Sequence, residues 1–162
     1  MPIAKGHVTD EFDCGKPALN DWLRNHALQS DAAGAARVFV TTEDETNVVG
    51  YYALAGADVE PAAATERLAK GQPRHRDISV VLLARLAVDG RHQSQGVGRS
   101  LLRDAMKRSV IAAENVGLRA ILVHAKDDEA RRWYENYGFE SSPTDPLHLI
   151  LLMKDVRATL QI

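Results

Sequence analysis

Cysteine is nearly absent from this chain, which has Cys14 as the only one among its 162 residues. A single cysteine cannot form an internal disulfide, so an apolar core must hold the fold together and a reducing compartment is expected. No apolar run is long enough to span a bilayer, and residues 1–7 lack the apolar stretch of a signal peptide. These absences favour a cytoplasmic protein that has no membrane partner.

Clustered metal ligands and a strong net charge are also missing. The six histidines form no metal-ligand spacing, so no metal is expected. The formal net charge of −2 argues against a uniformly basic nucleic-acid binder. Basic residues nevertheless cluster at positions 74–76, 91–92 and 131–132, and each cluster is either a local binding patch or ordinary solvated surface.

Length and composition are those of one globular domain over residues 1–162, with 45% hydrophobic and 26% charged residues. This composition is ordinary for a soluble protein with a sizeable core. The predicted order of elements fits an α/β protein with a mixed sheet and helices on both faces. Apolar spacing predicts helices at 17–28, 97–116 and 128–137, a helix and loop at 61–77, and strands at 37–42, 48–54, 78–88, 119–124 and 147–153.

The most informative stretch is the turn between the predicted strand 78–88 and the helix that follows it. Gly96 and Gly98 stand there with one residue between them. Glycines at such a turn let the backbone approach an anion, and the free N–H groups of the helix start then hold a phosphate. The pattern from Gln93 is Gln-x-x-Gly-x-Gly, which is neither a dinucleotide fingerprint nor a nucleoside triphosphate loop. Alone, it predicts either a pyrophosphate site or a turn whose glycines serve packing.

This pattern resembles the acetyl-CoA loop of the GNAT family of N-acetyltransferases, and a second segment agrees with it. Residues 130–140, Ala-Arg-Arg-Trp-Tyr-Glu-Asn-Tyr-Gly-Phe-Glu, are similar to the family's signature helix, which carries a tyrosine towards the cofactor sulfur. The resemblance implies a single GNAT-fold domain of the α/β (α+β) class, with a mixed and mostly antiparallel central sheet flanked by helices. Acetyl-CoA, as co-substrate, would lie in the cleft after the central strand.

The same resemblance implies roles for individual residues. Tyr134 matches the tyrosine that protonates the CoA thiolate, and a phenol is protonated at neutral pH. Asp127 stands where many family members have an asparagine, so that contact with CoA is not carried over. Backbone N–H groups would hold the acetyl carbonyl and the pantetheine arm at Leu86, Ala87 and Val88. The CoA phosphates would be held, mostly through backbone groups, by Arg91, Gln93, Ser94, Gln95, Gly96, Val97, Gly98 and Arg99.

Further segments narrow the resemblance to acetyltransferase toxins of bacterial toxin–antitoxin modules. This branch implies a type II toxin that acetylates the α-amino group of aminoacyl-tRNA and blocks translation. It also implies a ribbon-helix-helix antitoxin encoded nearby, and a homodimer. The segments are residues 12–15, 19–23, 50–54, 83–89, 123–125 and the closing Tyr-Gly-Phe-Glu-Ser-Ser-Pro-x-Asp-Pro-Leu. The residues expected to contact RNA phosphates are Arg74, Arg76, Arg85, Arg131 and Arg132, with Arg85 alternatively in a structural pair.

Two other functions stay open from the sequence. An α-amino group titrates at about 7.7–8.0 and a lysine at about 10.4, so an aminoacyl acceptor needs less help from a general base. The matched segments supply no clearly placed catalytic Glu or His. This favours aminoacyl-tRNA over the first alternative, a general N-acetyltransferase for a small amine, a protein N-terminus or a lysine. The second alternative is a non-catalytic module that binds acetyl-CoA or an antitoxin.

Overall fold

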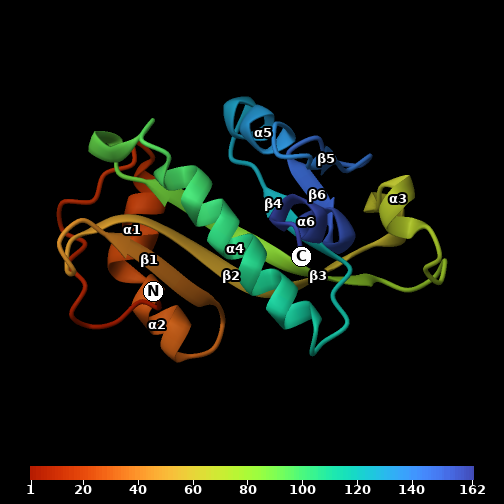
Figure 1. Cartoon of the computed structure of the whole chain (residues 1–162), viewed down its shortest axis with the longest axis horizontal. Coiled ribbons are helices and arrows are strands. Elements are labelled where there is room, and N and C mark those ends of the chain that lie inside the picture. The colour runs from red at the N-terminus through yellow and green to blue at the C-terminus, as the bar shows by residue number, and fades with distance from the viewer. The chain divides into compact units, whose positions relative to one another are not determined.

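The computed structural model describes all 162 residues and contains a six-stranded sheet with flanking helices (Figure 1). The strand order is β1-β2-β3-β4-β6-β5. Strands β3 and β4 are parallel, whereas the pairs β1–β2, β4–β6 and β5–β6 are antiparallel, which confirms the predicted mixed sheet. The elements are α1 (Pro17–Asn25), α2 (Ala27–Ala32), β1 (Arg37–Thr42), β2 (Val48–Val59), the 3-10 helix η1 (Pro61–Ala63), α3 (Glu66–Ala69), β3 (Ile78–Val88), the 3-10 helix η2 (Gly90–His92), α4 (Val97–Ala113), β4 (Ala120–His124), α5 (Asp128–Glu135), β5 (Glu140–Ser141), β6 (His148–Leu152) and α6 (Met153–Leu160).

The residues group into two compact units, each made of two stretches of the chain. The first unit comprises Met1–Ala55 and Ala84–Ala105, and the second comprises Gly56–Leu83 and Met106–Ile162. Strands β2 and β3 and helix α4 contribute residues to both. Each unit has an apolar core of its own. None of the helices is both long and apolar enough to cross a membrane.

In the first unit, α1 packs beside β2 through aromatic side chains. Tyr51 is fully buried, with its ring 6.0 Å from that of Trp22 and 5.7 Å from that of Phe12. The Tyr51 hydroxyl donates a hydrogen bond to the Leu19 carbonyl oxygen at 2.7 Å, so α1 is joined to β2 by apolar and polar contacts together. The N-terminal residues Met1–Ile3 pair along β1 through backbone hydrogen bonds.

In the second unit, β4 is buried along most of its length because it has neighbours on both sides. Val81–Leu83 of β3 pair with Ile121–Val123 in parallel register, and β6 pairs antiparallel from Ala120↔Leu152 to His124↔His148. Its first four residues are all buried, so side chains on both faces of the strand are covered, which explains its continuous apolar run. The α6 helix follows β6 directly and buries Met153, Val156 and Leu160.

Several predicted boundaries are wrong, although the strands at 37–42 and 78–88 are confirmed with the same ends. The predicted helix 17–28 is two helices, because His26 (φ −129°, ψ −26°) leaves helical geometry between them. Helix α4 ends at Ala113 instead of 116, and β2 continues to Val59. The strand β5 was not predicted because two residues form no pattern, and the helix α6 was not predicted because it directly follows the apolar run of β6.

Replacing Gly50 with alanine is expected to destabilise the fold by about 1–3 kcal/mol, the usual cost of overpacking. An added Cβ would lie 2.9 Å from Leu101 Cδ1, 3.1 Å from Thr41 Cγ2 and 3.2 Å from Val97 Cγ1. Gly56→Ala is the matched control on the same strand, because nothing lies within 4 Å of its added Cβ. Urea unfolding measures both variants. An equal midpoint for the two would contradict this account of the β2–α4 packing.

Candidate active site

The turn from β3 to α4 has the backbone conformation of an anion-binding loop. Ser94 (φ +65°) and Gly96 (φ +83°) are both left-handed, which is ordinary for glycine and strained for serine. Backbone that alternates in this way can direct successive N–H groups to one side as a nest for an anion. The N–H of Ser100 donates to the Gly96 carbonyl, so the N–H groups of the residues before it lie in the unbonded first turn of α4. Gln95, Gly96 and Arg99 are exposed there.

Two of the predicted cofactor residues use their side chains to hold this turn in place. The Gln93 amide donates to the Val88 carbonyl at 2.9 Å and to the Cys14 carbonyl at 3.2 Å. The Arg91 guanidinium donates to Asp89 from Nε at 3.0 Å and from a terminal nitrogen at 3.3 Å. The side chains of both residues therefore make structural contacts within the protein.

Asp89, at the end of β3, is a functional candidate that sequence reasoning missed. Its side chain is almost fully buried and accepts hydrogen bonds from the backbone N–H groups of Arg91 (2.9 Å) and Asp13 (3.1 Å). Burial opposes ionisation, but the hydrogen bonds from Arg91 and Asp13 outweigh it and lower the pKa of Asp89 to about 2. The signal in the sequence was a lone carboxylate between an apolar strand and a glycine turn.

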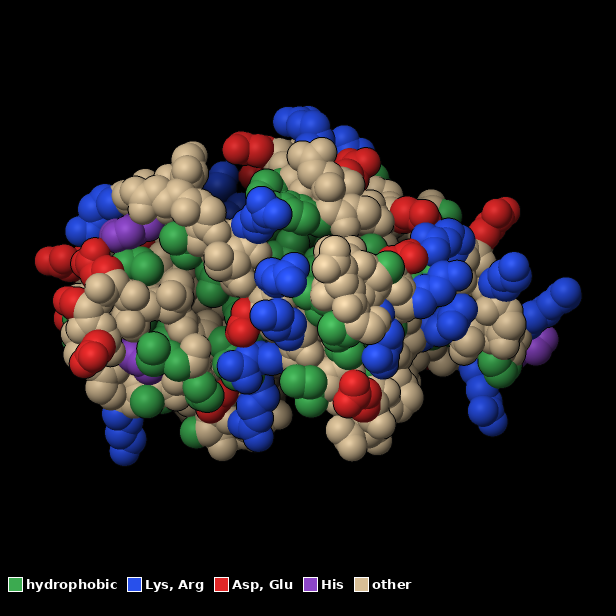
Figure 2. All heavy atoms as spheres, in the orientation of Figure 1, with side chains coloured by type: hydrophobic (Ala, Val, Ile, Leu, Met, Phe, Trp, Pro, Cys, Tyr) green, Lys and Arg blue, Asp and Glu red, His purple; other side chains and the backbone are tan.

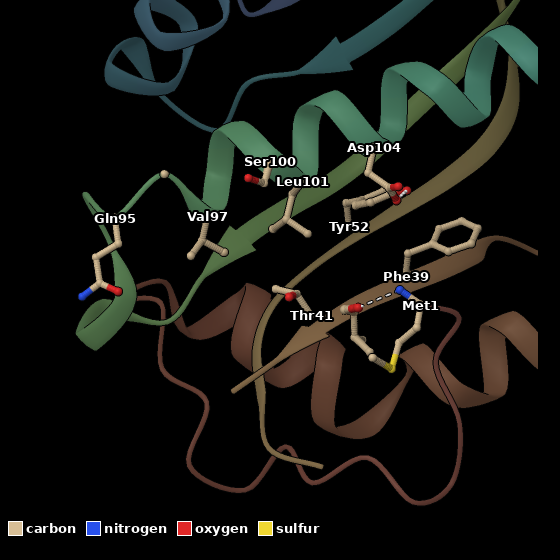
Figure 3. Close-up of a pocket in the computed structure, with 11 residues that line it drawn as sticks. Met1, Phe39, Thr41, Tyr52, Gln95, Val97, Ser100, Leu101 and Asp104 are labelled. Atoms are coloured by element: carbon tan, nitrogen blue, oxygen red, sulfur yellow. Dashed lines mark hydrogen bonds between the residues drawn. The ribbon is translucent and has the colours of Figure 1, made fainter. Parts of the chain in front are cut away.

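A cavity of about 370 Å³ lies between the start of α4 and the strands β1 and β2 (Figure 3). Phe39, Thr41 and Tyr52 line it from the strands, and Ser100 and Asp104 line it from the helix. The Tyr52 hydroxyl donates to the Asp104 carboxylate. This hydrogen bond joins β2 to α4 at the cavity.

The strand end that precedes the loop differs in exposure from residue to residue. Ala87 is buried, whereas Leu86 and Val88 are half-buried. Arg85, predicted to contact RNA or to pair structurally, places its guanidinium carbon 4.1 Å from the centre of the Trp22 ring. This cation–π contact agrees with the second alternative, in which Arg85 pairs with a group of the protein.

In the second unit, α5 carries Tyr134 on its buried face. Asp127 caps the helix by accepting a hydrogen bond from the Ala130 N–H at 2.8 Å, so the residue that replaces the family's asparagine has a structural role here. The Tyr134 ring contacts Trp133 (5.0 Å between centroids) and Phe139 (5.4 Å). Burial raises the pKa of Tyr134, so its phenol keeps its proton well above neutral pH.

The other arginines predicted to contact RNA lie in the second unit and differ in their freedom. Arg74 and Arg76 are exposed on the segment between α3 and β3. Arg131 is half-buried and lies 3.5 Å from Asp128 and 3.6 Å from Glu135 on its own helix, whereas Arg132 is exposed.

Figure 2 shows Lys and Arg side chains gathered over α4 and near α3 and α6. Arg103 on α4, exposed one turn after Arg99, was not predicted, although the spacing of four was visible in the sequence.

His124 and His148 stack on each other at one rung of the β4–β6 pair, with 4.0 Å between ring centroids. Burial lowers the pKa of His124, and charge on His148 lowers it further, so His124 is neutral at pH 7. The stacked ring is therefore a packed residue of the β4–β6 pair. No group of His, Cys, Asp and Glu side chains is arranged to hold a metal ion.

The chain belongs to the GNAT family of acetyltransferases, because the family model for the acetyltransferase (GNAT) domain matches residues 34–141. Within the family it is similar to the tRNA-acetylating toxin of Mycobacterium tuberculosis (strain ATCC 25618 / H37Rv). The two are 52% identical over 156 residues, which cover 96% of this chain and 92% of that protein. This confirms both the predicted family and the predicted toxin branch, and defines the protein as an acetyl-CoA-dependent N-acetyltransferase.

Two solved structures show the same fold with bound molecules. AtaT complexed with acetyl-methionyl-tRNAfMet has a TM-score of 0.88 and 28% identity, covering 97% of this chain and 94% of that one. A mutant of AtaT bound to the C-terminus of the antitoxin AtaR and acetyl-CoA has a TM-score of 0.83 and 27% identity, covering 100% and 97%. The tRNA, the antitoxin segment and the acetyl-CoA of these complexes are bound to AtaT, and the site residues of this chain stay predictions.

Proposed function

We propose that this protein is the toxin of a type II toxin–antitoxin system, and that it transfers the acetyl group of acetyl-CoA to the α-amino group of aminoacyl-tRNA. The observation that carries the proposal is the 52% identity over nearly the whole chain to a tRNA-acetylating toxin. The complex of AtaT with an acetylated methionyl-tRNA supports the α-amino acceptor. Acetylation of that amine removes the nucleophile of peptide-bond formation, so translation stops.

The donor end of the reaction is assigned to the first unit. Backbone N–H groups of residues 93–99 bind the pyrophosphate of acetyl-CoA, aided by the positive end of the α4 dipole. N–H groups of Leu86, Ala87 and Val88 bind the pantetheine arm and the acetyl carbonyl. There they stabilise the negative charge that develops on the carbonyl oxygen.

The chemical step needs little from a general base. The neutral α-amine attacks the thioester carbonyl, and a tetrahedral intermediate forms. Its carbon–sulfur bond then breaks, the nitrogen gives its proton to water, and Tyr134 donates the phenolic proton to the CoA thiolate. The buried phenol keeps its proton at neutral pH and so is available as a donor when the thiolate forms, and the resulting tyrosinate regains a proton from solvent once CoA leaves.

The acceptor is expected to contact the protein through its phosphates. Arg74, Arg76 and Arg132 are exposed and therefore remain the stronger RNA candidates. Arg85 and Arg131 each have protein contacts that a phosphate would have to displace. The further partners we assign are a ribbon-helix-helix antitoxin encoded nearby and a second copy of the chain, and the setting is the cytoplasm.

The function is tested by incubating the protein with labelled acetyl-CoA and total charged tRNA, with and without prior deacylation of the tRNA. We expect label on the charged tRNA only, because deacylation removes the acceptor amine. Sequencing the labelled pool then identifies the acceptor. Absence of label from tRNA, together with CoA release in the presence of peptides or polyamines, would replace the proposal with a general N-acetyltransferase.

A further inference from the structure

We propose that the N-terminal segment 13–20 and Asp89 form a brace that holds the pyrophosphate loop in its binding conformation before acetyl-CoA arrives. Asp13, Asn20 and Asp89 are thus positioning residues for the donor. This inference rests on the proposed role of residues 93–99 in binding the pyrophosphate. The motif Phe-Asp-Cys-Gly at residues 12–15 then supports donor binding, although it lies far from the loop in sequence.

Asp13 is the central link of the brace. Its N–H donates to the Asp89 carboxylate at 3.1 Å, and its carbonyl accepts from the Gly90 N–H at 2.8 Å. Its own carboxylate accepts from the Gly15 N–H and from the Asn20 amide, both at 2.9 Å. The consecutive residues Asp89 and Gly90, which follow β3 and lead to the loop, are therefore both fixed to one residue of the N-terminal segment.

A second link runs through Cys14 to Gln93, the first residue of the loop. The Cys14 N–H donates to the Asn20 side-chain oxygen at 2.9 Å, and the Cys14 carbonyl accepts from the Gln93 amide at 3.2 Å. The same Gln93 nitrogen reaches the Val88 carbonyl at the end of β3. Asn20 is buried, and its amide accepts one hydrogen bond through the oxygen and donates one through the nitrogen. A side chain of similar size that cannot both accept and donate would leave one of these partners without its hydrogen bond.

The brace contains two carboxylates, although the loop that it supports is proposed to bind an anion. Hydrogen bonds from Gly15 and then Asn20 lower the pKa of Asp13, and those on Asp89 hold that group ionised as well. Arg91 neutralises Asp89 by a two-nitrogen contact. Backbone N–H groups and the helix dipole are thus left to attract the pyrophosphate.

Preorganisation explains why such a network is useful. The loop contains Ser94 in a left-handed conformation, which an unsupported chain populates only rarely. Without the brace, the binding of acetyl-CoA would have to order the loop at the same time, and the affinity would fall by that cost. Loss of one hydrogen bond to a charged, buried partner corresponds to about a tenfold to hundredfold change.

The test compares Asp89→Asn and Asn20→Ser with the wild type, using two acetyl donors. Acetyl-CoA contains the pyrophosphate, whereas acetyl-pantetheine lacks it. We expect both variants to raise the dissociation constant and the KM for acetyl-CoA about tenfold or more. We expect kcat/KM with acetyl-pantetheine to fall much less, because that donor lacks the group that the loop is proposed to bind. Asp21→Asn is the matched control, because Asp21 is exposed on the same helix and contacts only Asn25 and His26.

Hydrogen exchange of residues 90–96 in the ligand-free protein provides a second readout that does not depend on activity. We expect faster exchange in the Asp89 and Asn20 variants and recovery of protection at saturating CoA. Equal losses with both donors, or unchanged exchange in the loop, would overturn the brace. If the wild type uses acetyl-pantetheine as well as acetyl-CoA, the proposed pyrophosphate loop fails instead, which separates the two inferences.

Discussion

Tyr134→Phe is expected to lower kcat for acetyl transfer by about 10²- to 10⁴-fold, the usual contribution of a general acid. The variant keeps the ring contacts with Trp133 and Phe139 and loses only the phenolic proton donor. The CoA thiolate must then leave without protonation. Acetyl-CoA affinity, measured by calorimetry, is expected to stay within about twofold because the hydroxyl is a small part of the binding surface.

Tyr137→Phe is the control for this experiment, since Tyr137 lies two positions beyond the same helix and packs against Trp133. It is expected to retain wild-type kcat. The pH profile adds a check on the mechanism. Because burial raises the pKa of Tyr134, the acid form persists at higher pH, and kcat should not fall as the pH passes the ordinary tyrosine value of about 10. Equal kcat in the Tyr134 variant and the wild type would remove Tyr134 from the mechanism.

Replacing Arg74 and Arg76 together with serine is expected to raise the KM for charged tRNA by about tenfold and to leave the KM for acetyl-CoA unchanged. Both side chains are exposed on one segment between α3 and β3. Loss of two phosphate contacts should also flatten the dependence of log KM on log salt by about 1.4–1.8, at roughly 0.7–0.9 for each contact. Initial rates at several salt concentrations measure both quantities.

A double variant of Lys5 and Arg37 to serine is the control for net charge, because it also removes two exposed cations. Its salt dependence should match that of the wild type. If both double variants change the salt dependence equally, the effect is one of total charge, and the segment with Arg74 and Arg76 is not an RNA contact.

The sequence predicted the strands and the strand-to-helix loop well because their signals are local. The strand 78–88 is an apolar run bounded by polar residues, and its ends were placed correctly. The break at His26 could not be predicted, because a continuous apolar face runs through it and only packing against the sheet decides where the helix bends. The helix 153–160 was missed for a related reason, since its first apolar residue continues the run of β6.

For the candidate site, two short motifs led to the prediction of the loop and Tyr134, whereas no motif indicated the hydrogen-bond network that holds the loop. Asp13 and Asp89 are 76 positions apart, and no local pattern relates a carboxylate after one strand to a backbone N–H near the N-terminus. The cation–π contact between Arg85 and Trp22 could not be predicted for the same reason, because Trp22 lies on a helix that is distant in sequence. Contacts of this kind become visible only when the chain is folded.

The sheet edges limit the ways in which a partner protein can be recognised. Residues 1–3 occupy the outer edge of β1 through hydrogen bonds between Met1 and Val40 and between Ile3 and Val38. At the other end of the strand order, β5 has only the residues Glu140 and Ser141. Strand addition requires a free edge of several residues. A protein partner is therefore expected to be recognised through side chains and helix surfaces, where a single substitution can change which partner binds.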